Sequence, residues 1–114
     1  MNENDLARLN HMQDYAREAV TFLEGKARDA LGTNVMLARA VTYSVGIIGE
    51  AASAISQETR NANPQIPWRE AIAIRNFLFH AYFKVELGIL WETVQKSLPL
   101  LIAELEKLLA SENE

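Results

Sequence analysis

The chain contains no cysteine and little glycine or proline, and these absences narrow its possible fold and location. Without cysteine, the 114 residues can form neither disulfide bonds nor a thiolate metal site, so nothing points to secretion. Five glycines and three prolines are too few for the many turns of a β-sandwich. The acidic N-terminal residues do not resemble a signal peptide, and no unbroken apolar run approaches the ~20 residues that span a bilayer. We therefore expect a cytoplasmic protein with no membrane segment, metal or cofactor.

Helix-forming residues dominate what is present. Sixteen alanines and fourteen leucines make up over a quarter of the chain, and hydrophobic residues reach 49%. Apolar residues recur every three or four positions over most of the sequence, which is typical of amphipathic helices. We predict an all-α protein, a four- to five-helix up-and-down bundle. A single domain should cover residues 1–110, with a frayed tail at 111–114.

Prolines and capping residues set the expected helix boundaries. Pro67 suits the first turn of a helix, where its missing N–H costs nothing. Pro99 must kink or restart the last helix, and Ser97 could cap the segment that follows. The predicted helices run from 5 to 24, from 33 or 34 to 57 or 60, from 67 to between 81 and 83, and from 86 onward.

Small residues gather along the second predicted helix, at Gly46, Gly49, Ala52 and Ser53. Their clustering predicts that a neighbouring helix approaches its backbone closely. A phosphate-binding loop is excluded, because no strand precedes these residues and no Gly-Lys-Ser or Gly-Lys-Thr follows them.

The net charge of −4 is distributed unevenly along the chain. Residues 60–85 carry a net charge of +3, whereas residues 1–59 carry −3 and residues 86–114 carry −4. The acidic total disfavours indiscriminate binding of nucleic acid. The basic segment could still confine such binding to one part of the surface.

The third predicted helix is apolar on nearly all sides. A helix of that kind is buried on more than one face, and a bundle of 114 residues can hardly surround it. A second copy of the chain covering the outer face is the simplest solution. We therefore expect a homodimer that forms through the helix over residues 67–83.

Four polar residues interrupt this apolar helix: Arg75, Asn76, His80 and Tyr82. At about 100° per residue, Asn76 and His80 share a face, whereas Arg75 and His80 lie roughly 140° apart. They could converge if the helix ends near His80 or if two copies face each other. The alternative is a purely structural network at the dimer interface, with Arg75 paired to Glu50 or to a backbone carbonyl, because an unpaired buried guanidinium is costly.

The stretch from Arg75 to Tyr82 resembles the Arg-x-x-x-x-His-x-Tyr signature of HepT-like toxins of the HEPN superfamily. The similarity extends over residues 35–105, through Ile47-Ile-Gly-Glu-Ala-Ala52, Asn63-Pro-Gln-Ile-Pro-Trp-Arg-Glu70, Leu90-Trp-Glu-Thr-Val94 and Leu98-Pro99-Leu100. One departure is Ala81, where relatives often have glycine.

This resemblance implies a small all-α homodimer that is a metal-independent endoribonuclease, the toxin of a toxin–antitoxin pair. Arg75 and His80 would be catalytic and Asn76 would support them. Tyr82 would carry the hydroxyl that a cognate MntA-like nucleotidyltransferase antitoxin adenylylates. The RNA substrate could be transfer RNA or messenger RNA.

The chemistry of these residues is consistent with a ribonuclease, and one alternative function stays open. Histidine can move a proton near neutral pH, and arginine offers a fork of donors to phosphate oxygens. His11, the only other histidine, is expected on a polar surface, so His80 is the one candidate imidazole in each copy. The alternative is a non-catalytic helical module that dimerises and docks a nucleotidyltransferase.

Overall fold

The computed structural model describes residues 1–80 and 86–112, and over these residues the protein is entirely helical apart from its turns and loops. The elements are α1 (Glu3–Leu23), α2 (Ala30–Thr33), α3 (Val35–Ala54), α4 (Gln57–Ala62), α5 (Trp68–His80), α6 (Leu87–Glu92), the π-helical turn η1 (Thr93–Ser97) and α7 (Leu98–Glu112). The predicted all-α bundle is therefore confirmed.

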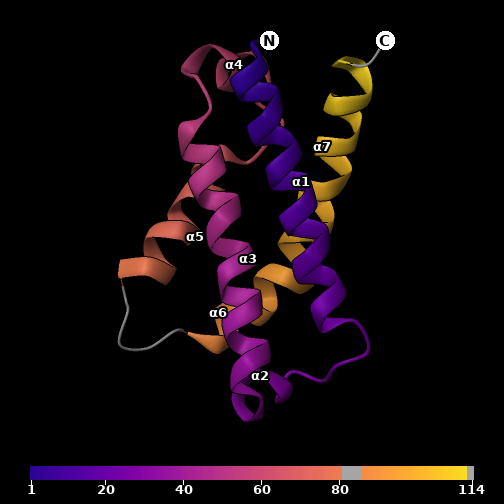
Figure 1. Cartoon of the computed structure of the whole chain (residues 1–114), viewed down its shortest axis with the longest axis vertical. Coiled ribbons are helices and arrows are strands. Elements are labelled where there is room, and N and C mark those ends of the chain that lie inside the picture. The colour runs from indigo at the N-terminus through magenta and orange to yellow at the C-terminus, as the bar shows by residue number, and fades with distance from the viewer. Residues whose placement is uncertain (81–85, 113–114) are drawn as a thin grey trace.

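The long helices run alternately up and down, so both termini lie at the same end of the molecule (Figure 1). The helix α3 packs against both α1 and α5, and α7 packs against α1. The short helices α2 and α4 sit at opposite ends of α3, with α4 beside the N-terminus. This arrangement places α5, which carries three of the four polar residues singled out from the sequence, at one side of the bundle.

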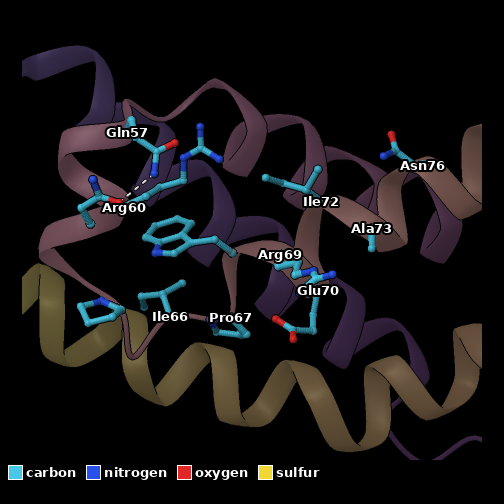
Figure 2. Close-up of a pocket in the computed structure, with 12 residues that line it drawn as sticks. Gln57, Arg60, Ile66, Pro67, Arg69, Glu70, Ile72, Ala73 and Asn76 are labelled. Atoms are coloured by element: carbon cyan, nitrogen blue, oxygen red, sulfur yellow. Dashed lines mark hydrogen bonds between the residues drawn. The ribbon is translucent and has the colours of Figure 1, made fainter.

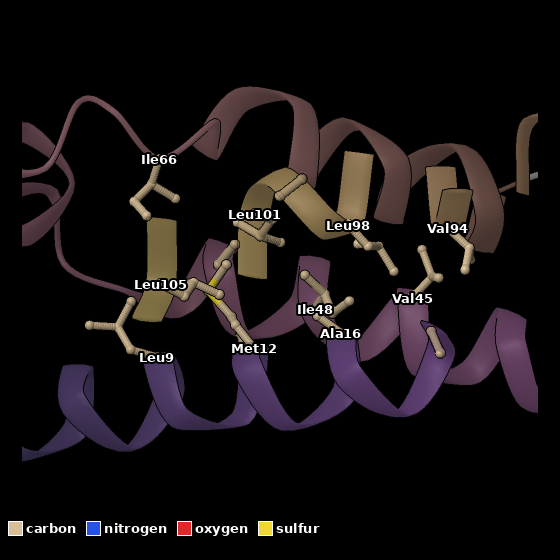
Figure 3. Close-up of a cluster of buried hydrophobic side chains, with 14 of the residues drawn as sticks. Leu9, Met12, Ala16, Val45, Ile48, Ile66, Val94, Leu98, Leu101 and Leu105 are labelled. Carbon is tan, nitrogen blue, oxygen red and sulfur yellow. The ribbon is translucent and has the colours of Figure 1, made fainter. Parts of the chain in front are cut away.

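The core is an apolar layer shared by α1, α3 and the C-terminal helices (Figure 3). Leu9 and Met12 of α1 are fully buried, and Leu105 of α7 lies against them. His11, one position from this stripe, is exposed as expected. Burial of each such large side chain stabilises the fold by about 2 kcal/mol, so this layer supplies most of the driving force.

Of the described helices, α3 alone is long and apolar enough to cross a membrane by length and composition. A core helix passes the same test, and α3 lies between α1 and α5 with Val41 and Val45 buried. It also carries Arg39 and Glu50, both exposed. Its place in the bundle accounts for its apolar character.

The prediction that the second helix reaches residue 57 or 60 is wrong. The helix α3 ends at Ala54, and Ile55 and Ser56 adopt extended backbone angles before α4 begins. The Ser56 side chain accepts a hydrogen bond from the backbone N–H of Thr59, so it is the N-cap of α4. The apolar pattern continues through the break because Ile55 is itself buried.

A buried carboxylate holds this break in place. Asp5 of α1, only 1% exposed, accepts hydrogen bonds from the backbone N–H and the hydroxyl of Ser56 and from the hydroxyl of Thr59. Burial alone would raise the pKa of Asp5, but the hydrogen bonds from Ser56 and Thr59 outweigh it and lower that pKa. Asp5 thus ties the start of α1 to the start of α4.

Pro99 neither ends the last helix nor restarts it after a cap at Ser97. The chain stays helical from Leu87 to Glu112, and the turn before the proline widens into η1, where the Leu98 N–H reaches the Thr93 carbonyl. A wide turn suits this position, because proline has no N–H to donate and its ring clashes with the carbonyl four residues earlier. The last helix also includes residues 111 and 112 of the tail expected to fray, and residues 113–114 lie outside the described residues.

The close approach of α3 and α5 predicted from small residues is present at Gly49. A Cβ atom at Gly49 would lie 2.2 Å from the Cβ of Arg75 and 2.8 Å from the carbonyl oxygen of Ala71. Both neighbours are fixed to the α5 backbone, so only glycine fits without moving that helix. The predicted end of α5, between 81 and 83, lies outside the described residues.

Replacing Asp5 by asparagine should remove a pH-dependent part of the stability. Because folding lowers the pKa of Asp5, its contribution is complete above the unfolded-state value near 3.8 and is lost as the pH falls through the lower folded-state value. In urea unfolding at pH 7, Asp5→Asn should lower the free energy of unfolding by about 2 kcal/mol. Between pH 7 and about 3, the wild type should lose more stability than the variant. Equal losses would contradict this role for Asp5.

Gly49→Ala should destabilise the protein by about 2 kcal/mol, because the added methyl group forces α3 and α5 apart. The matched control is Gly32→Ala in α2, where a Cβ atom meets nothing within 4 Å. That variant should unfold at the same temperature as the wild type or higher, since alanine favours a helix over glycine. Thermal unfolding followed by circular dichroism measures both, and equal midpoints would argue against the close approach.

Candidate functional site

Arg75 lies in the middle of α5, with its side chain directed over α3. Its Nη1 lies 3.7 Å from Oε1 of Glu50 and donates a hydrogen bond of 3.3 Å to Oγ of Ser53. The pairing with Glu50 is the one expected from the sequence, whereas the bond to Ser53 was not foreseen. Both partners follow Gly49 within one helical turn, so the close approach of the helices places the guanidinium within their reach.

This pairing orients the Arg75 side chain but is weak enough to leave its guanidinium available to a ligand. The Arg75 side chain is 26% exposed and the Glu50 side chain 57% exposed, and ion pairs of this kind contribute only about 0–1 kcal/mol. A phosphate oxygen makes a stronger, charge-assisted contact with a guanidinium. Arg75 is therefore held in position and remains able to exchange Glu50 for an anionic ligand.

The other predicted site residues lie elsewhere or outside the described residues. Asn76 follows Arg75 but is exposed on a different side of α5. His80 is the last residue of α5, and its side chain is outside the described part of the protein. Tyr82 and Ala81 also lie outside it. The structure thus places Arg75 and Asn76 and leaves the position of the His80 imidazole and the Tyr82 hydroxyl as predictions.

Asn76 lies at the rim of a broad groove between α4 and α5, here called the α4–α5 groove (Figure 2). The groove encloses about 920 Å³ and is walled by α4, by the loop after it and by the first half of α5. Its lining includes Arg60, Asn61, Trp68, Arg69, Ala73 and Asn76. It is thus built entirely from the segment that begins just before the basic stretch of the sequence.

A chain of hydrogen bonds fixes the wall of this groove. The indole N–H of Trp68 donates to the carbonyl of Asn63 at 2.9 Å, and the Asn63 amide donates to the carbonyl of Thr59 at 2.9 Å. The Thr59 hydroxyl in turn donates to Asp5. The groove is therefore preformed rather than dependent on a ligand to order it.

Arg60 and Arg69 are the residues that sequence reasoning missed. The count of +3 for residues 60–85 signalled a basic region, but nothing in the sequence indicated that α4 and α5 bring these two arginines to one groove. Within the described residues, no group of three or more histidine, aspartate or glutamate side chains is placed to hold a metal ion. The α4–α5 groove instead carries two cationic side chains, Arg60 and Arg69, against one carboxylate, Glu70.

Comparison with known proteins gives the family. The model of the Ribonuclease HepT-like family matches residues 12–108. A protein of Thermococcus cleftensis named "Probable ribonuclease HepT" is 35% identical over 103 residues, which are 87% of this chain and 93% of that protein.

Two further relatives are each named "Putative RNase". The one from Methanocaldococcus jannaschii is 31% identical and covers 93% of this chain and 98% of its own length. The one from Caldanaerobacter subterraneus is also 31% identical, with 91% and 93% covered. No solved structure is similar enough to count as a match. The family model spans most of the chain, so this protein belongs to the Ribonuclease HepT-like family.

Proposed function

We propose that the protein is a metal-independent endoribonuclease that cleaves RNA through the ribose 2′-hydroxyl and acts as the toxin of a toxin–antitoxin pair in the cytoplasm. The observation that carries the proposal is Arg75, the first residue of the Arg-x-x-x-x-His-x-Tyr signature, held partly exposed by weak contacts in a chain that belongs to a ribonuclease family. Transfer RNA and messenger RNA are both candidate substrates.

The proposed chemistry divides between His80 and Arg75. Cleavage at the 2′-hydroxyl needs one group to remove its proton and another to protonate the leaving oxygen, and an imidazole can perform either step near neutral pH. The Arg75 guanidinium would bind the scissile phosphate and stabilise the negative charge that develops on it. Asn76 would support these groups as a neutral hydrogen-bonding side chain.

A homodimer through α5 would supply two imidazoles to one cleft. An apolar cavity of about 220 Å³ lies beside α5, between α3 and the C-terminal helices, and Leu100 on its edge is 71% exposed. Ile74 of α5 also lines this cavity. These apolar groups favour a covered face, and burying them against a second copy would bring two α5 helices together.

Control of the toxin would act through Tyr82. Its partner would be an MntA-like nucleotidyltransferase antitoxin that transfers AMP from ATP to the Tyr82 hydroxyl and releases pyrophosphate. The added phosphate would be attached to a residue that follows Arg75 closely in the sequence. It would compete with the RNA phosphate for the basic side chains of the site, such as Arg75. Inhibition would then need no change of fold.

A second candidate function has one observation in its favour. The contacts of Arg75 with Glu50 and Ser53 are also what a structural network would show. In that case the protein would be a non-catalytic helical module that dimerises and docks the nucleotidyltransferase.

Replacing His80 or Arg75 by alanine should reduce RNA cleavage by at least about a hundredfold, because each change removes a group from the reacting centre. Cleavage of purified transfer RNA and messenger RNA, followed by mapping of the new ends, measures this loss. Light scattering should show an unchanged dimer of twice the 12.8 kDa chain mass in both variants. Undiminished cleavage by His80→Ala would reject the proposed mechanism, and a monomeric mass for the wild type would reject the shared cleft.

Tyr82→Phe should keep toxicity and RNA cleavage but escape the antitoxin, because it retains the ring and lacks the hydroxyl that accepts AMP. Mass spectrometry after incubation with the nucleotidyltransferase and ATP should show added AMP on the wild type and none on the variant. Tyr43→Phe on α3, at a tyrosine that is exposed in the structure, is the matched control and should still be modified. AMP found on Tyr82→Phe protein would place the modification at another residue.

A further inference from the structure

The α4–α5 groove has no part in the proposed chemistry except for Asn76 at its rim. Two arginines, Arg60 and Arg69, line it against a single acidic residue, Glu70, so the groove is net positive in an acidic protein. The Nε atom of Arg60 is buried and has no hydrogen-bond partner in the part of the chain that the structure describes. A buried donor without a partner is costly, so Nε does not anchor the Arg60 guanidinium to the rest of the protein.

One face of α5 connects this groove with the position of His80. At 100° per residue, positions 69, 73, 76 and 80 lie within about 60° of one another, and Arg69, Ala73 and Asn76 are exposed. Position 69 lies ~16 Å along the helix axis from position 80. A strand bound at the proposed catalytic residue and lying along this face would therefore run directly into the groove.

We propose that the α4–α5 groove binds the single-stranded RNA that flanks the scissile phosphate. Arg69 and Arg60 would contact its phosphate oxygens, and the amide group of Asn61 would contact a base edge, the division of roles that nucleic-acid interfaces commonly show. This inference rests on the proposed ribonuclease function. An acidic segment of a protein partner would also suit two arginines, but the shared face with position 80 favours the substrate.

The test compares two charge reversals, one in the groove and one near the start of α3. Arg69→Glu alters the groove, whereas Arg39→Glu makes the same change at an exposed position near the start of α3, far from α4 (Figure 1). Each is combined with His80→Ala to prevent cleavage, and binding of a fluorescein-labelled single-stranded 20-nucleotide poly(U) is measured by anisotropy over a range of salt concentrations. Arg69→Glu should weaken binding by roughly tenfold and reduce the salt slope by about 0.7, the loss of one phosphate contact. Arg39→Glu should change the affinity by less than about twofold.

Kinetics with the native His80 provide the second measurement. Arg69→Glu should raise KM and leave kcat near the wild-type value, because the groove holds RNA away from the reacting phosphate. Equal effects of Arg69→Glu and Arg39→Glu would overturn the proposal. The proposal would also be overturned if Arg69→Glu left the RNA affinity unchanged and weakened binding of the nucleotidyltransferase, because the groove would then bind that partner.

The two proposals can fail separately. If the wild type cleaves RNA and Arg69→Glu behaves like the wild type, the groove assignment falls and the ribonuclease stands. If the wild type binds poly(U) through Arg69 but cuts no RNA, the ribonuclease falls and the groove remains an RNA-binding site. Circular dichroism melting of both arginine variants should match the wild type, because both side chains are exposed.

Discussion

The contact between α3 and α5 at Gly49 determines where Arg75, the proposed phosphate-binding residue, lies on the bundle. Because no side chain separates the two backbones there, the Cβ of Arg75 lies directly over α3. The following turn of α3 then brings Glu50 and Ser53 within reach of the guanidinium. The absence of a side chain at Gly49 thus determines both how closely α5 packs on α3 and how Arg75 is oriented.

A second constraint, the Asp5 carboxylate, shapes the other side of α5. It draws Ser56 and Thr59 toward the start of α1, so α3 stops and α4 turns to form a wall of the groove. The bond from Asn63 to Thr59 extends this link toward Trp68. A residue near the N-terminus therefore influences a surface built more than 50 residues later, and stability and groove shape should vary together.

The sequence predicted the structural features that depend on local periodicity. It predicted little of the structure that depends on contacts between residues far apart in the chain. Regular apolar spacing located α1 and α3, and the small residues foretold the close approach at Gly49. The break after Ala54 was missed because the apolar pattern runs through buried Ile55, and the residue that captures Ser56 lies 51 positions away. The groove was missed for the same reason, since Arg60 and Arg69 converge only when the loop between their helices folds back.

The weakness of the Arg75–Glu50 pair suits a site that must bind and release an anion. A tight buried ion pair would make the guanidinium unavailable, and an unpaired one would have no fixed direction. Here Ser53 and the exposed Glu50 keep Arg75 aligned in advance, so the proposed replacement of the carboxylate by a phosphate would need little reorganisation. The acidic remainder of the chain would repel nucleic acid, which would confine favourable contacts of the proposed RNA substrate to the basic segment around α5. Specificity in this small protein would then come from the positions of Arg60, Arg69 and Arg75 rather than from its overall charge.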